Sequence, residues 1–146
     1  MAEYHELNFV NLEKNEVVET IYIDDDFFYY LEELYPIESK LFKNIPVFYT
    51  SDLDFRGLKK FQIRKPLKKG IFLAGINILN DFSFEELLLS VNKWIYIAEN
   101  LDECILEELD YELKKEELTN NFNKLSNALK NISSNNLEYI LLWEGI

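Results

Sequence analysis

The chain has 146 residues, of which 48% are hydrophobic and 15% aromatic, so it can bury the core of one folded domain and is not globally disordered. One cysteine excludes an internal disulfide framework. The acidic start and the short apolar runs are unlike a secretory signal or a membrane-spanning helix, so we expect a cytoplasmic protein. The net charge of −12 disfavours nucleic acid and anionic membranes as partners.

This charge is unevenly distributed along the chain. Residues 1–55 hold 13 acids and 3 bases, residues 56–69 hold 7 bases and no acid, and residues 70–146 hold 14 acids and 5 bases. An acidic surface attracts basic partners and raises their association rate, although net charge can also serve only to keep a protein soluble. We expect the basic segment to pair with the protein's own acids or with an acidic spot on a partner, and not to bind nucleic acid.

The first elements are a strand pair and a short helix. Residues 4–12 and 17–23 contain alternating or β-branched apolar positions, which predicts two strands joined by a turn at 13–16. Asp24 is expected to cap a helix that runs to about Tyr35, where a proline ends it.

The middle of the chain is expected to complete a sheet. Residues 37–49 are predicted to be irregular except for a short strand at 47–49. Further strands are predicted at 58–64 and 71–79, joined by residues 65–70, and the second is apolar enough to lie centrally.

The segment from Ser83 to Leu101 is the clearest core-forming stretch. Ser83 and Glu86 have the spacing of a capping box, which predicts the start of a helix. Apolar residues then recur at steps of three and four, as expected for one buried helical face. They are Phe84, Leu87, Leu88, Val91, Trp94, Ile95, Ala98 and Leu101.

Two more helices and a strand are predicted after this segment. Asp102 can cap a helix to about Glu117, and a second apolar stripe predicts another helix, which ends at the linker 133–136. Residues 137–143 fit a final strand, and a short helix nearly as well. The stripe consists of Leu118, Phe122, Leu125, Leu129 and Ile132. The element order predicts a single α+β domain over residues 1–146, with a mainly antiparallel sheet packed by three or four helices.

Few residues offer catalytic chemistry. His5, the one histidine, is expected to be an exposed structural residue on an edge strand, and Cys104 a half-buried packing thiol. Residues 70–75 have the glycine spacing of a phosphate loop without its Lys and Ser/Thr, and residues 52–57 resemble a calcium loop but place Arg56 at a ligand position. We therefore expect no enzyme activity, no cofactor and no metal.

Two acidic helix faces are the candidate binding sites. Each surrounds a tyrosine with carboxylates, which could anchor a cationic protein, although any amphipathic helix also has a solvated charged face. The first face comprises Asp25, Asp26, Tyr29, Glu32 and Glu33. The second comprises Glu103, Glu107, Asp110 and Tyr111. Consecutive aspartates on a helix diverge by about 100°, so Asp24 to Asp26 are not expected to share a metal ion.

A small acidic chain with little catalytic chemistry and with these faces resembles the immunity proteins that neutralise bacterial toxins, including those of contact-dependent growth inhibition. The resemblance implies a tight heterodimer with a cationic toxin domain, for example a nuclease, whose site would be covered by carboxylates that replace phosphates. It implies no small-molecule substrate. One alternative is a DNA-mimicking inhibitor or regulatory adaptor. Another is a carboxylate-dependent enzyme, which predicts a concave pocket with two or more acids of raised pKa.

Overall fold

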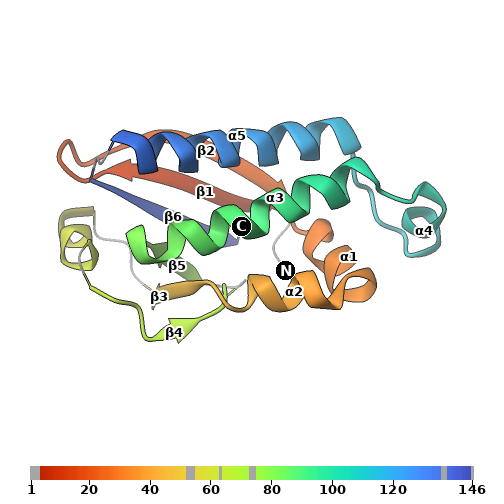
Figure 1. Cartoon of the computed structure of the whole chain (residues 1–146), viewed down its shortest axis with the longest axis horizontal. Coiled ribbons are helices and arrows are strands. Elements are labelled where there is room, and N and C mark those ends of the chain that lie inside the picture. Colours follow the sequence, from red (N-terminus) through yellow and green to blue (C-terminus); the bar gives the residue numbers. More distant parts are fainter. Residues whose placement is uncertain (1–3, 52–54, 63, 73–74, 136–137, 146) are drawn as a thin grey trace.

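The computed structural model describes residues 4–51, 55–62, 64–72, 75–135 and 138–145. These residues form six strands, five α-helices and one 3-10 helix, η1 (Figure 1). In chain order the elements are β1 (Tyr4–Asn11), β2 (Glu16–Asp24), α1 (Asp26–Leu34), α2 (Pro36–Phe42), β3 (Pro46–Thr50), η1 (Phe55–Phe61), β4 (Lys68–Lys69), β5 (Ile76–Leu79), α3 (Asp81–Glu99), α4 (Glu103–Glu108), α5 (Lys115–Asn135) and β6 (Tyr139–Gly145).

The strands form one sheet in the order β2-β1-β6-β5-β3-β4, and every described pair is antiparallel. β1 and β6 are neighbours inside the sheet although they lie far apart in the sequence, and Leu7 stands opposite both Ile21 and Trp143. The register of β1 against β2 shifts between Phe9 and Val10, where Val18 is the extra residue of β2. The predicted α+β class with a mainly antiparallel sheet is confirmed.

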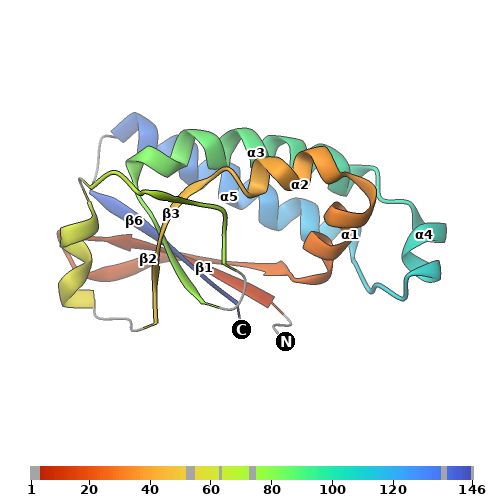
Figure 2. The same cartoon turned by 90° about the horizontal axis from the view of Figure 1, so that it is seen from below.

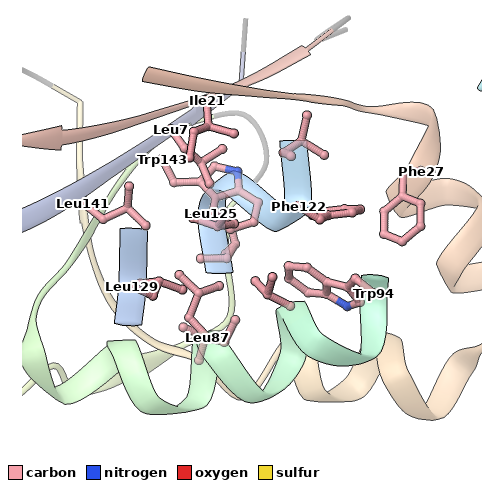
Figure 3. Close-up of a cluster of buried hydrophobic side chains, with 14 of the residues drawn as sticks. Leu7, Ile21, Phe27, Leu87, Trp94, Phe122, Leu125, Leu129, Leu141 and Trp143 are labelled. Carbon is pink, nitrogen blue, oxygen red and sulfur yellow. The ribbon is translucent and has the colours of Figure 1, made fainter. Parts of the chain in front are cut away.

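Helices cover one face of this sheet. Figure 2 shows α3 and α5 side by side above the strands, with α1 and α2 next to them and α4 at one end. Trp94 of α3, Phe122 of α5 and Trp143 of β6 meet in the main core and are completely buried (Figure 3). The predicted α5 stripe is buried at all five positions, because residues three and four apart share one helical face.

On the opposite face, the described covering elements gather at one end. There η1 packs on a second apolar cluster, to which it contributes Leu58 and Phe61. Side chains alternate along a strand, and Leu7 and Ile21 enter the main core, so Tyr4 and Tyr22 point away from the helices. Tyr4 is 47% and Tyr22 50% exposed. The end of the sheet that carries these tyrosines therefore presents aromatic surface to solvent.

The structure corrects three predictions in the middle of the chain. The strand predicted at 58–64 is wrong, because residues 55–61 form η1, whose three-residue turn places Leu58 and Phe61 on the same face. The irregular stretch predicted from residue 37 is wrong for residues 37–42, since a proline begins α2, whereas β3 confirms the strand predicted at 47–49. The strand predicted at 71–79 is confirmed only at 76–79, where it is central as expected.

The helix boundaries also differ from their sequence signals. Asn80 caps α3, and Ser83 is buried, where its hydroxyl donates to the Pro46 carbonyl at 2.5 Å, so the predicted capping box is not used. Asp102 caps α4 as predicted, but that helix ends at Glu108. α5 extends to 135, into the predicted linker 133–136, and β6 confirms the final strand.

Parts of several predictions fall outside the described residues. These are residues 52–54 of the rejected calcium loop, residue 63 of the predicted strand 58–64, residues 73–74 of the rejected phosphate loop, and residues 136–137 of the linker and final strand.

Candidate functional site

Three consecutive aspartates occupy the junction between β2 and α1, and the change from strand to helix separates their side chains. Asp24 ends β2 and stands opposite Tyr4 of β1. Asp25 precedes the helix and is only 5% exposed, whereas Asp26 begins the helix. The carboxylate of Asp24 accepts a hydrogen bond from the Asp26 N–H at 3.0 Å. The three carboxylates therefore have different environments.

The carboxylate of Asp25 belongs to a buried network. The Trp143 indole N–H donates to Nδ1 of His5 at 2.9 Å, and Nε2 of His5 lies 2.5 Å from Asp25. Because the indole can only donate, Nδ1 must accept, and the ring proton is on Nε2, where it is donated to Asp25. Burial lowers the pKa of His5, although the neighbouring Asp25 acts in the opposite direction. The network thus holds a neutral histidine in the core.

Two predictions fail at this network. His5 was expected to be exposed on an edge strand, but β6 pairs with β1 on the side opposite β2, so His5 lies inside the sheet and is fully buried. Asp25 was expected on an exposed face, but its partner His5 draws it into the interior. Asp25 is therefore not available to a binding partner.

Asp24 and Asp26 instead line an acidic groove with a cavity volume of about 820 Å³. The groove lies where the end of β2 meets α1, the segment after α4 and the start of α5. It contains four carboxylates, one lysine and two tyrosines. Its lining residues are Tyr4, Tyr22, Asp24, Asp26, Glu112, Leu113, Lys114, Glu117, Leu118 and Asn121.

The two aspartates of the groove are crowded by other acids. Burial raises the pKa of Asp24, and repulsion from Asp26, Asp25 and Glu117 adds to the shift, against the hydrogen bond from the Asp26 backbone. Burial also raises the pKa of Asp26, with further repulsion from Asp25, Glu112 and Asp110, against a hydrogen bond from the Glu112 backbone. Both side chains are thus more costly to ionise than free aspartates.

The structure joins parts of the two predicted acidic faces into one surface. Asp110 has a positive φ of 58°, at the turn where the chain leaves α4. Tyr111, which follows it, packs on the main core near α1. Burial raises the pKa of Tyr111, and nearby Glu33, Asp26 and Tyr29 contribute. Tyr29, which is 40% exposed, therefore lies beside the groove together with acids of both predicted faces.

The remaining predicted residues lie elsewhere. Glu32 is exposed, and its carboxylate is 4.0 Å from the ammonium of Lys43. Glu103 and Glu107 are exposed on α4 and are not among the residues that line the groove.

Several groove residues were missed because they are distributed over separate elements. Tyr22 could have been noticed, since it stands between the apolar Ile21 and Ile23 in a strand pattern that turns it outward. Asp24 was predicted to cap a helix and not to share a metal ion with Asp25 and Asp26, so it was not among the predicted binding residues. Glu117 and Asn121 are four residues apart on one helical face, but their proximity to β2 depends on tertiary packing.

The basic segment does not pair with the protein's own acids among the described side chains. Lys60 lies over the ring of Phe61 and Lys68 over that of Tyr49, each with its nitrogen 5.1 Å from the ring centroid. The first of the two expectations for this segment is therefore not confirmed among these side chains, and pairing with a partner stays a prediction.

Other chemical features of the described residues are limited. Cys104 is exposed, contrary to the half-buried position expected. Within the described ranges, no three or more His, Cys, Asp and Glu residues are grouped so that they could hold a metal ion. None of the described helices combines the length and apolar character needed to cross a membrane. In comparisons with known proteins, no family model, curated protein or solved structure matches this chain.

Proposed function

We propose that this chain is a non-catalytic binding protein that receives a cationic protein domain at its acidic groove and neutralises it. The observation that carries this proposal is the convergence of Asp24, Asp26, Glu112 and Glu117 in one cavity whose lining includes a single cation, Lys114. A lysine or arginine from a partner would relieve the repulsion among these carboxylates as it binds.

The aromatic residues around the groove suit a protein partner. Tyr4 and Tyr22 line the cavity, and Tyr29 and Tyr111 lie next to it. Tyrosines are frequent anchors of protein interfaces, and their faces attract guanidinium and ammonium groups. The net charge of −12 would accelerate association with a basic domain. An inhibitor of a toxin that binds phosphate groups, in the manner of an immunity protein, fits these properties.

The test is capture of a partner from the lysate of the native host, followed by inhibition of that partner's activity. A groove variant would carry Asp24→Asn, Asp26→Asn, Glu112→Gln and Glu117→Gln. A matched control would carry Glu85→Gln, Glu86→Gln, Glu99→Gln and Glu138→Gln, which are exposed and outside the groove lining. Both variants remove four negative charges.

We expect a stoichiometric basic partner to be retained and inhibited by the wild type and by the control, and to be lost by the groove variant. If both variants lost the partner equally, the overall negative charge, and not the groove, would explain binding. Retention by the groove variant would move the binding site elsewhere and contradict the proposal.

A carboxylate-dependent enzyme is the second candidate, and one observation favours it. Asp24 and Asp26, two acids of raised pKa, line one cavity, as that alternative predicts. An acid–base pair, however, needs environments that separate the two pKa values, and here both shift upward. The assay is hydrolysis of a panel of nitrophenyl glycosides between pH 4 and 7. Turnover by the wild type that disappears in Asp26→Asn would replace the binding proposal.

A further inference from the structure

The outer edge of β2 extends this proposal. β2 has nine residues and ends the sheet, and no described strand pairs with its outer side. An unpaired edge is a template for another strand, and proteins usually blunt it by shortness, charged side chains, proline or a bulge. β4, at the other edge, consists of Lys68 and Lys69 alone, whereas β2 contains neither lysine nor proline. The bulge at Val18 interrupts β2, but its stretch from Glu19 to Asp24 pairs regularly with β1, is longer than β4, and carries acids as its only charged residues.

The acidic groove reaches around this edge of β2. Tyr22 and Asp24 line it from β2, and Glu117 and Asn121 line it from α5, which covers the other face of the sheet. Figure 1 shows β2 and α5 running side by side. The cavity therefore occupies space that a strand added to β2 would enter.

A second, smaller hollow lies farther along the same strand and helix. Its volume is about 120 Å³. Its lining includes the aliphatic side chains of Val18 on β2 and Ile132 on α5. Val18 and Asp24 are six residues apart, or about 20 Å of extended chain. The edge thus offers an apolar contact near one end and an acidic groove at the other.

We propose, on the basis of the proposed function, that an extended basic segment of the cationic partner adds as a strand to the outer edge of β2. Backbone hydrogen bonds would form along the edge, lysine or arginine side chains would enter the groove, and an apolar side chain would contact Val18. A second copy of this chain is disfavoured because β2 carries Glu16, Glu19 and Asp24 and no base, so two copies would bring like charges together.

The test uses the probe peptide acetyl-(Val-Lys)4-amide and the isotope-labelled full chain. Two matched peptides of equal charge would carry backbone N-methyl groups on all valines or on all lysines, so that each blocks one edge of the extended peptide. We expect the unmodified peptide to bind and one methylated peptide to bind more than about tenfold more weakly, because it loses several backbone hydrogen bonds. Amide exchange should slow at alternate residues of β2 between Glu19 and Asp24.

Each other outcome overturns strand addition without deciding the proposed function. Equal binding of all three peptides, with loss in the groove variant, would leave charge recognition alone. No binding of the unmodified peptide, or protection outside β2, would reject this use of the edge, while partner capture still tests the groove. A dimer of the free chain in sedimentation velocity that protects β2 would identify a second copy as the occupant.

Discussion

Aspartate side chains have opposite roles in two neighbouring regions, the buried network at Asp25 and the acidic groove at Asp24 and Asp26. Asp25 has a hydrogen-bond donor in His5 and almost no contact with solvent. Its neighbours face other carboxylates in an open cavity, and burial with repulsion raises the pKa of each. Removing a buried, paired carboxylate destabilises a fold because its partner is left unpaired, whereas crowded carboxylates repel one another and favour a cationic partner. In the proposed function, stability and recognition thus depend on adjacent residues.

Of the substitutions in these two regions, Asp25→Ala should change the free energy of unfolding most. The substitution leaves the Nε2–H of His5 buried without an acceptor and opens a small void between β1 and α1. We expect the free energy of unfolding at pH 7.5 to fall by about 3 kcal/mol. Urea unfolding followed by tryptophan fluorescence measures this change, since Trp143 belongs to the same network.

Asp25→Asn is the matched control, because its amide oxygen can still accept the hydrogen bond. Its loss should be about 1 kcal/mol. If both variants unfold within about 0.5 kcal/mol of the wild type, Asp25 is not a stabilising residue and the contrast with the groove is lost.

As the pH falls, the buried network and the acidic groove should change the stability of the fold in opposite directions. Burial lowers the pKa of His5 from its usual 6.5, so the unfolded chain binds this proton more readily. Its contribution is fully present above pH 6.5 and is lost as the pH falls toward the folded pKa. From pH 7.5 to 5.5 we expect the free energy of urea unfolding to fall, by at most about 1.4 kcal/mol, which is the limit set by protonation of the unfolded histidine.

The groove aspartates act in the opposite direction. Their folded pKa values lie above the ordinary 3.8, so the stability that they remove at neutral pH returns as they are protonated. As the pH falls toward 3.8, the wild type should therefore regain stability that the variant Asp24→Asn with Asp26→Asn does not regain. A flat profile in that variant from pH 7.5 to 5.5 would contradict the role given to His5.

Much of the fold follows from local patterns in the sequence. The α5 stripe and the β1–β2 pair were predictable because each buries one face with a regular period. The segment around Leu58 and Phe61 was misassigned because their spacing of three suits a 3-10 turn, and only the second core shows which face is buried.

The candidate site depends on contacts that local patterns do not contain. The three aspartates are equivalent in the sequence, and Asp25 is distinguished only by His5, whose burial depends on a strand more than 130 residues away. The acidic character of α1 was predictable. Its meeting with Glu112 and Glu117 was not, because it requires the turn after α4 and the packing of α5 against β2.

Asp24→Asn should produce the smallest change, and one of opposite sign to Asp25→Ala. Because the pKa of Asp24 is raised, its ionised form is less favourable in the folded than in the unfolded chain at pH 7. The amide keeps an acceptor for the Asp26 N–H and removes the charge. We expect unfolding at pH 7 and low salt to become harder by roughly 0.5 kcal/mol, since solvent screens this partly exposed group.

Salt distinguishes this explanation from a packing effect. If repulsion in the groove is the cause, the gain in Asp24→Asn should shrink in 0.5 M NaCl, because added ions screen the same repulsion in the wild type. The exposed Glu86→Gln, which also removes one charge, should change stability less. Asp24→Asn should weaken binding to the captured partner, whereas Glu86→Gln should not. A variant that is both less stable and a better binder would reverse the assignment of Asp24 to recognition.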